Sequence, residues 1–271
     1  MPERHRTPLK PLCQGRASSC GACCGLYNCA DHSRPALRRL LDAHTDALAG
    51  APRTLEGFRE AGGRAAAAAA AEPVFASVRI CPLLGWVDAP RSRVGCLAHP
   101  ASTGGPDLRD AGAYDALTCE SFLCPSHAWL RAEEAEIVDE VCADAHLYGL
   151  VATDVPFLRG VLAALASRVG AAVERRHLRR PTFREALRAL FALKEELEPG
   201  SEGLFGAFRP DAAGEPVARS IDYAAVGRAG SPYDAILTCV GADPRSGNDL
   251  DRLEAEVRLR LDAAVRALTE A

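Results

Sequence analysis

The sequence predicts a mainly α-helical protein in which an irregular, cysteine-rich N-terminal half, tied by metal and holding few short strands, packs on a C-terminal helical bundle. Three observations support this fold class. Apolar residues recur at helical spacing after residue 127, β-prone pieces are short and confined to residues 74–97, and most cysteines precede residue 125. With 271 residues and 48% hydrophobic content, the chain can bury a full core.

We expect three regions along the chain. Residues 1–19 are rich in Pro, Arg and Ser without periodicity, which predicts a flexible arm whose Cys13 has no assigned role. Residues 20–128 form a cysteine-cluster metal-binding region, and residues 129–271 form a helical region. The sequence leaves open whether these last two regions are one domain or two.

The second region opens with four thiols within ten residues, at positions 20, 23, 24 and 29, among glycines that allow a tight loop. A Cys-x-x-Cys spacing lets one turn of backbone direct two sulfurs at one ion, as zinc sites and iron-sulfur clusters require. The adjacent Cys23 and Cys24 diverge by about 100° in a helix or about 180° in a strand. They therefore serve different ions or different atoms of a polynuclear cluster, or only one of them is a ligand.

Two helices are predicted after this loop. The first opens at Ser33 or Arg34, ends at Gly50, and places His44 on its apolar stripe. The second runs over residues 54–71 from a Thr54 cap, with a possible interruption at Gly62-Gly63.

Residues 74–80 and 81–87 are then predicted as two short strands or an irregular hairpin, followed by a mobile loop over residues 101–107. Cys81 and Cys96 lie at turns, where the backbone can present a thiolate. Cys119 and Cys124 supply a further pair, five residues apart.

The remainder is predicted to be helical, because apolar residues recur on one face of each segment. We expect one stripe over residues 130–148, a helix capped by Asp154, and a capping box at Thr182 whose helix stops near residues 199–200. A short helix over residues 232–240 and a last helix capped by Asn248 complete the chain. The basic run over residues 175–180 is expected to be a solvated helix end, and it is the one handle for a protein partner of the helical half.

The composition limits the kinds of partner that we expect for this chain. A net charge of -4 gives no broad attraction to phosphate backbones, so we expect no nucleic-acid partner, and the N-terminus lacks a secretory apolar run. We expect a cytoplasmic protein without a membrane association. Its eleven cysteines should then stay reduced, which disfavours a disulfide framework. Cys142 and Cys239, which lie outside the clusters, are interpreted as small buried hydrophobes.

A metal is the simplest common reason for separate turns to carry paired thiols in a reducing compartment. Eight thiolates could form two all-thiolate zinc sites or one iron-sulfur cluster with spare thiols, because both metals accept tetrahedral sulfur. Five further side chains near the thiols could complete a mixed site, although surface roles are expected for most of them: Asp31, His32, His99, Glu120 and His127. The predicted metal ligands are Cys20, Cys23, Cys24, Cys29, Cys81, Cys96, Cys119 and Cys124.

These motifs, over residues 18–128, resemble the YkgJ-type cysteine-cluster family, described as putative zinc- or iron-chelating domains of the CxxCxxCC type. The resemblance rests on Ser19-Cys-Gly-Ala-Cys-Cys24, Ile80-Cys-Pro-Leu-Leu84, Gly95-Cys-Leu97 and the Cys119 and Cys124 pair. Two departures exist. The family's leading cysteine is replaced in Arg16-Ala17, so Cys13 or Cys29 would substitute for it, and the segment after Gly95-Cys96 is Leu97-Ala-His-Pro100, which makes His99 a candidate ligand.

The resemblance implies metal binding more firmly than it implies a reaction, so whether the protein is an enzyme is left open. The favoured function is a metal-binding protein that chelates zinc or iron through thiolates from three loops. The alternative is an iron-dependent redox enzyme, or an enzyme like the lysine N-methylases grouped with this family. The sequence contains no P-loop, no glycine-rich nucleotide loop after a strand and no His-Glu-x-x-His motif.

Overall fold

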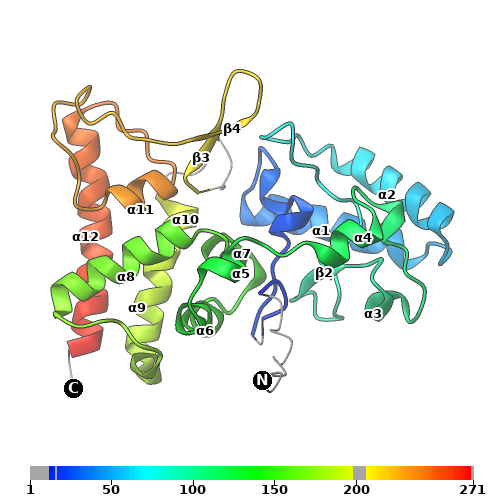
Figure 1. Cartoon of the computed structure of the whole chain (residues 1–271), viewed down its shortest axis with the longest axis horizontal. Coiled ribbons are helices and arrows are strands. Elements are labelled where there is room, and N and C mark those ends of the chain that lie inside the picture. Colours follow the sequence, from blue (N-terminus) through cyan, green and yellow to red (C-terminus); the bar gives the residue numbers. More distant parts are fainter. Residues whose placement is uncertain (1–11, 16, 198–205, 270–271) are drawn as a thin grey trace, which may run out of the picture.

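The structure is a computed structural model of the chain and describes residues 12–15, 17–197 and 206–269. It is mainly helical with two small antiparallel two-stranded sheets, which confirms the predicted fold class. Two lobes lie side by side (Figure 1). We call residues 17–121 the N-terminal lobe and residues 126–269 the C-terminal lobe. The segment of residues 122–125 connects them.

The N-terminal lobe begins with two 3-10 turns, η1 (Ala22–Cys24) and η2 (Leu26–Asn28), followed by helices α1 (Arg34–Ala49) and α2 (Leu55–Ala69). Both helices confirm the sequence prediction. Ser33 and Thr54 cap them, because their hydroxyls accept the amides of Ala36 and Gly57 at 3.4 and 3.1 Å. The predicted interruption of α2 is wrong: Gly62 stays helical, and its missing side chain lets Pro82 and Leu83 pack closely against the helix.

The strand predicted over residues 81–87 contains β1, whereas the one predicted over residues 74–80 is wrong. β1 (Leu84–Trp86) pairs antiparallel with β2 (Val94–Cys96), with Gly85 opposite Gly95. Residues 74–80 form turns instead, because the buried Asn28 side chain takes the place of a strand partner. Its amide donates to the carbonyls of Phe75 at 3.0 Å and Val78 at 2.6 Å, and its oxygen accepts from the Phe75 amide at 2.8 Å.

Replacing Asn28 with alanine is expected to destabilise the protein by about 2–4 kcal/mol, because three backbone groups inside the lobe would each lose a hydrogen bond to its side chain. Urea unfolding followed by circular dichroism measures the change. Asn248→Ala is the matched control, since Asn248 is exposed and should cost less than about 0.5 kcal/mol. Equal values for the two variants would contradict the role assigned to Asn28.

The rest of the N-terminal lobe is made of short turns: α3 (Pro100–Thr103), η3 (Arg109–Ala111) and α4 (Ala116–Ser121). The loop predicted over residues 101–107 therefore starts inside a helix. The His99 ring caps α3 by accepting the Ala101 amide at 3.1 Å, and Gly104 ends it with a φ of 78°.

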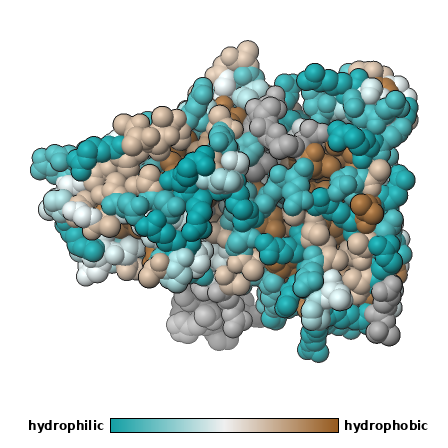
Figure 2. Space-filling model, turned by 180° about the vertical axis from the view of Figure 1, so that it is seen from behind, coloured by the Kyte–Doolittle hydropathy of each residue, from teal (hydrophilic) through white to brown (hydrophobic). Residues whose placement is uncertain are grey.

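The C-terminal lobe is a helical bundle around one large apolar core that includes the fully buried Phe157, Phe183 and Phe191. α12 packs along α9 and α8, and α11 packs on α8. Hydrophilic residues are spread over the outside of both lobes (Figure 2). The elements of the C-terminal lobe are α5 (Ser126–Trp129), α6 (Ala132–Val141), α7 (Ala145–Ala152), α8 (Val155–Val169), η4 (Arg175–Arg179), α9 (Pro181–Phe191), α10 (Leu193–Glu196), β3 (Phe208–Pro210), β4 (Pro216–Ala218), α11 (Asp234–Cys239) and α12 (Gly247–Thr269).

Cap predictions in this lobe are partly confirmed. Asp154 caps α8 by accepting the Phe157 amide at 3.1 Å. The Thr182 capping box is wrong, because α9 begins at Pro181, whose fixed φ suits a first helical position. Ser246, not Asn248, caps α12 by accepting the Asp249 amide at 3.1 Å. The predicted stop near residues 199–200 lies outside the described residues, while the short helix expected over residues 232–240 is α11.

Two further expectations for this lobe are revised. The stripe predicted over residues 130–148 is divided between two helices, α6 and α7, because Asp144 opens α7 with a new cap. The basic run forms η4, and Arg175 is held against α6 by Glu140 and by Glu136 at 3.5 Å. The charge of Arg175 is therefore paired with carboxylates of the same chain.

Among the described residues, no single helix has the length and apolar character needed to cross a membrane. One bent pair, α7 with α8 at 87°, passes that test by length and composition together.

Candidate metal centre

The cysteine loop is built on glycines that allow close packing. Gly25 joins η1 to η2 with a φ of 80°, and a side chain there would meet the Arg79 carbonyl oxygen at 2.3 Å. A side chain on Gly21 would meet Leu84 of β1 at 2.9 Å. These contacts press the loop against the turn that carries Cys81.

Backbone hydrogen bonds fix the loop at both ends. The Cys81 amide donates to the Cys24 carbonyl at 2.9 Å, and the Cys20 amide donates to the Cys13 carbonyl at 3.0 Å. Ser19 also accepts the Val94 amide of β2 at 2.7 Å. Segments that are 57 and 75 residues apart in the chain therefore meet around the first cysteines.

Cys119 reaches the same region from α4. This helix sits on η3, where Ala116 donates its amide to Asp110 at 2.7 Å and Arg109 lies 3.7 Å from Glu120. Gly112, directly after η3, is so close to Cys81 that a side chain on it would meet the Cys81 sulfur at 3.1 Å. α4 is thus placed beside the Cys81 turn.

Electrostatics shows which thiols are neighbours. Burial raises the pKa of Cys20, and the thiolate charges of Cys23, Cys124 and Cys13 raise it further. Burial likewise raises the pKa of Cys13, with contributions from Cys23 and Cys124. These contributions identify Cys13, Cys20, Cys23 and Cys124 as interacting thiols.

Cys24 belongs with a different group. Its pKa is raised first by its hydrogen bond to Cys23, then by burial and by the charges of Cys23, Cys81 and Cys96. Burial raises the pKa of Cys96 to about 11, with contributions from Cys81 and Cys119. Burial also raises the pKa of Cys119, which the charges of Cys81 and Cys23 raise further and Arg109 opposes.

Cys23 is the thiol of this centre best suited to react at neutral pH. A hydrogen bond from Cys24 is the main reason that its pKa is lowered to about 7. It is also exposed, as is Cys119, whereas Cys20 and Cys24 are half-buried. The lowered pKa favours the thiolate of Cys23, which is the form that binds metals.

Cys29 lies apart from the other predicted ligands. It is 4% exposed and packs in an apolar cluster with Leu37 and Leu40 of α1. Burial raises its pKa to about 11 with a contribution from Asp31, and no other cysteine contributes. Cys142 and Cys239 are buried, as predicted.

The sequence left open whether Cys13 or Cys29 substitutes for the family's leading cysteine. In the structure Cys13 lies beside Cys20, whereas Cys29 does not. Residues 14 and 19 pair as an antiparallel bridge, which returns the chain on itself and sets Cys13 beside Cys20. The signal in the sequence was a short polar turn containing Gly15, flanked by two cysteines seven residues apart.

The thiols are neighbours without converging. Within residues 12–15, 17–197 and 206–269, no three His, Cys, Asp or Glu side chains meet at a point that could hold a metal ion. Two thiolate charges 4 Å apart repel each other by about 4 kcal/mol at an effective dielectric constant of 20. Convergence of these sulfurs therefore depends on a cation that offsets the repulsion.

The other candidate ligands have their own places. His99 is used as the α3 cap, Glu120 lies near Arg109, and Asp31 accepts the Ser33 amide at 3.1 Å. His32 is 6% exposed, and burial lowers its pKa. His127 is half-buried in α5. The backbone amide of His99 hydrogen-bonds the Cys96 thiol and opposes the rise in its pKa.

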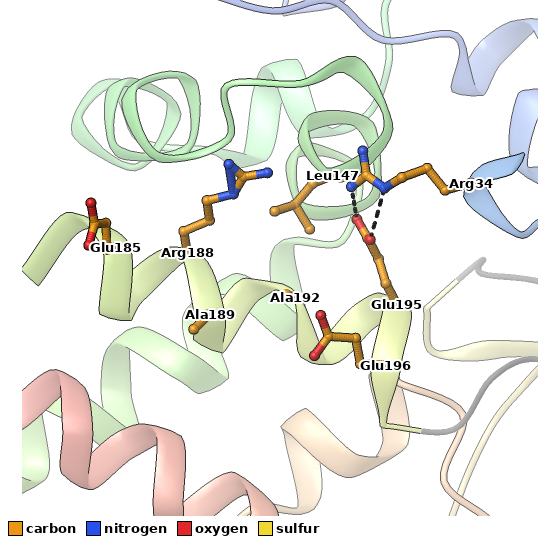
Figure 3. A pocket seen from close by; sticks show the side chains of 8 residues that line it. All are labelled: Arg34, Leu147, Glu185, Arg188, Ala189, Ala192, Glu195 and Glu196. Carbon is orange, nitrogen blue, oxygen red and sulfur yellow. Dashed lines mark hydrogen bonds and ion pairs between the residues drawn. The ribbon is translucent and has the colours of Figure 1, made fainter. Parts of the chain in front are cut away.

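A pocket of about 430 Å³ lies away from the thiols, where α9 and α10 face α7 and the start of α1 (Figure 3). Its charges are largely paired: Arg34 binds Asp144 at 2.7 Å and Glu195 at 2.6 Å, and Arg188 binds Asp144 at 2.8 Å. Arg34 comes from the N-terminal lobe and its partners from the C-terminal lobe. The pocket walls therefore join the lobes.

Comparison of the chain with protein-family models, curated proteins and solved structures gives no match. The resemblance to the YkgJ-type family thus rests on the cysteine motifs alone.

Proposed function

We propose that this protein binds zinc or iron through the thiolates of its N-terminal lobe, with the helical bundle as scaffold. One observation carries the proposal: backbone hydrogen bonds and apolar packing bring the cysteine-bearing segments together, so that each of eight thiols interacts with the charge of at least one other. These thiols belong to Cys13, Cys20, Cys23, Cys24, Cys81, Cys96, Cys119 and Cys124.

The donor chemistry suits a soft or borderline metal. Thiolates are the ligands that structural zinc and iron-sulfur clusters prefer. Burial keeps Cys20 protonated in the absence of a cation, and the hydrogen bond to Cys23, together with burial, does so for Cys24, so metal binding would release protons. No feature of the described residues favours the alternative of a redox or methylating enzyme.

The test is anaerobic purification followed by elemental analysis and a visible spectrum. We expect stoichiometric metal, either zinc in a colourless protein or iron in a brown one. Cys23 and Cys119 provide the matched readout, because both are exposed and should react with iodoacetamide only after chelation. A metal-free protein that takes up neither zinc nor iron, with both thiols always reactive, would refute the proposal.

A further inference from the structure

We infer that helix α7 of the C-terminal lobe positions the first cysteines of the candidate metal centre, with Tyr27 and Tyr148 as the two positioning residues. The inference rests on the proposed function and adds residues, outside the set of thiols, on which its metal affinity depends. Tyr27 holds the cysteine loop on α7, and Tyr148 holds the turn that carries Cys13. Neither tyrosine is assigned as a metal ligand.

Tyr27 attaches the cysteine loop to α7 through its hydroxyl. The residue lies in η2 of this loop and is only 2% exposed. Its hydroxyl donates to the carbonyl oxygens of Ala145 and His146, at 3.1 and 3.0 Å, at the start of α7. One turn further along the helix, a side chain at Gly149 would meet the hydroxyl oxygen at 2.0 Å. Glycine at this position therefore leaves the space that Tyr27 occupies.

The apolar cores of both lobes share α7. Ala145 and Leu150 pack in the cluster of the N-terminal lobe that contains Tyr27. Leu147, on the same helix, packs in the core of the C-terminal lobe instead. Cys20, at the start of the cysteine loop, packs against both clusters. The loop is therefore held on α7 by apolar packing as well as by the Tyr27 hydroxyl.

Tyr148 attaches the turn that carries Cys13. Its hydroxyl donates to the Leu12 carbonyl oxygen at 2.6 Å. Asp139 of α6 supports the same turn, because its carboxylate accepts the Ala17 amide at 3.2 Å. Two neighbouring helices of the C-terminal lobe thus fix the backbone on both sides of Cys13.

The two attached segments are joined to each other beside the first thiols. The Cys20 amide donates to the Cys13 carbonyl at 3.0 Å, so the turn and the cysteine loop form one unit. Neighbouring thiolates repel one another when no cation lies between them, which opposes closure of this unit in the metal-free protein. Contacts from outside the unit therefore determine how often it is closed and ready to bind metal. The two tyrosine hydroxyls provide such contacts from α7.

Hydrogen exchange of the metal-free, full-length protein tests whether α7 holds these segments. Tyr27→Phe and Tyr148→Phe each remove one hydroxyl and keep the ring. We expect about three- to tenfold faster exchange of backbone amides, in the cysteine loop for Tyr27→Phe and in the Cys13 turn for Tyr148→Phe, because each variant loses hydrogen bonding to its segment. Tyr223→Phe is the matched control. Its hydroxyl donates to Asp234 at 2.7 Å within the C-terminal lobe, so its loss should leave both segments unchanged.

Zinc affinity is the second readout, measured anaerobically by competition with a chromophoric chelator. The dissociation constant should rise at least about threefold in Tyr27→Phe and in Tyr148→Phe, because ordering a looser segment costs binding free energy. It should stay within about twofold of wild type in Tyr223→Phe. The number of zinc ions per chain should be the same in all variants, since neither tyrosine is a ligand. Circular dichroism checks that the variants fold.

The possible results separate this inference from the proposed function. Wild-type exchange rates in both tyrosine variants would overturn the inference, and so would faster exchange with an unchanged zinc affinity, which would make the tyrosines structural only. A variant that loses a zinc ion would also overturn it, because the tyrosine oxygen would then be a ligand. All three results leave the proposed function standing. A wild type that binds neither zinc nor iron would instead refute the proposed function.

Discussion

Replacing Asp154 with alanine is expected to destabilise the protein by about 3–5 kcal/mol, because it leaves a buried lysine without its counter-charge. The Lys194 side chain is fully buried, and its ammonium group donates to Asp154 at 2.7 Å and to the Cys239 carbonyl at 2.8 Å. The Phe157 ring lies 5.4 Å from the same ammonium group. Asp154 also caps α8, which is worth about 1 kcal/mol more.

Two variants separate these contributions. Asp154→Asn keeps an acceptor for the α8 cap but removes the charge, so it should cost less than Asp154→Ala. Lys194→Met/Asp154→Asn removes both charges and should recover part of the loss, because a buried ion pair is often replaceable by neutral groups. Urea unfolding gives all three values. An Asp154→Ala variant within about 1 kcal/mol of wild type would show that Lys194 is not held as the structure indicates.

This pair also shows where sequence-based prediction stops. Asp154 was predicted as a helix cap, because the signal for a cap is local: a short polar side chain before an apolar repeat. Its pairing with Lys194, 40 residues away, depends on how α8 and α10 pack, and no local pattern encodes that. The same distinction explains why α1, α2 and α8 were predicted well and the strands were not. The Asn28 side chain accepts a hydrogen bond from the Phe75 amide, 47 residues away, and so takes the place of a strand partner in a segment whose composition favours a strand.

The candidate metal centre shows the same difference between local signals and long-range contacts. Spacing alone indicated Cys20, Cys23 and Cys24 as ligands and left open whether the adjacent pair serves different ions, different atoms of one cluster, or supplies a single ligand. The choice between Cys13 and Cys29 was not local. It depends on a bridge between residues 14 and 19 on one side and on packing beside α1 on the other.

Removing metal is expected to make the chain between Cys119 and Cys124 the first site of cleavage by chymotrypsin, with a rate at least about tenfold higher than in the loaded protein. Residues 117–123 are all exposed, and α4 buries none of its side chains. Phe122 and Leu123, which chymotrypsin recognises, are 52% and 60% exposed. With so few contacts, metal bonds at the two flanking thiols would be the main restraint on local opening, and a tenfold change corresponds to about 1.4 kcal/mol.

Limited proteolysis with peptide mapping measures both rates. Cys29→Ser should be protected by zinc like wild type, whereas Cys119→Ser should be cleaved rapidly even with zinc present, since one end of the segment would be free. Leu259 serves as an internal control, because it is 62% exposed but lies in the middle of α12, where cleavage should be slow in both states. Equal rates with and without metal would mean that the ions do not hold this segment.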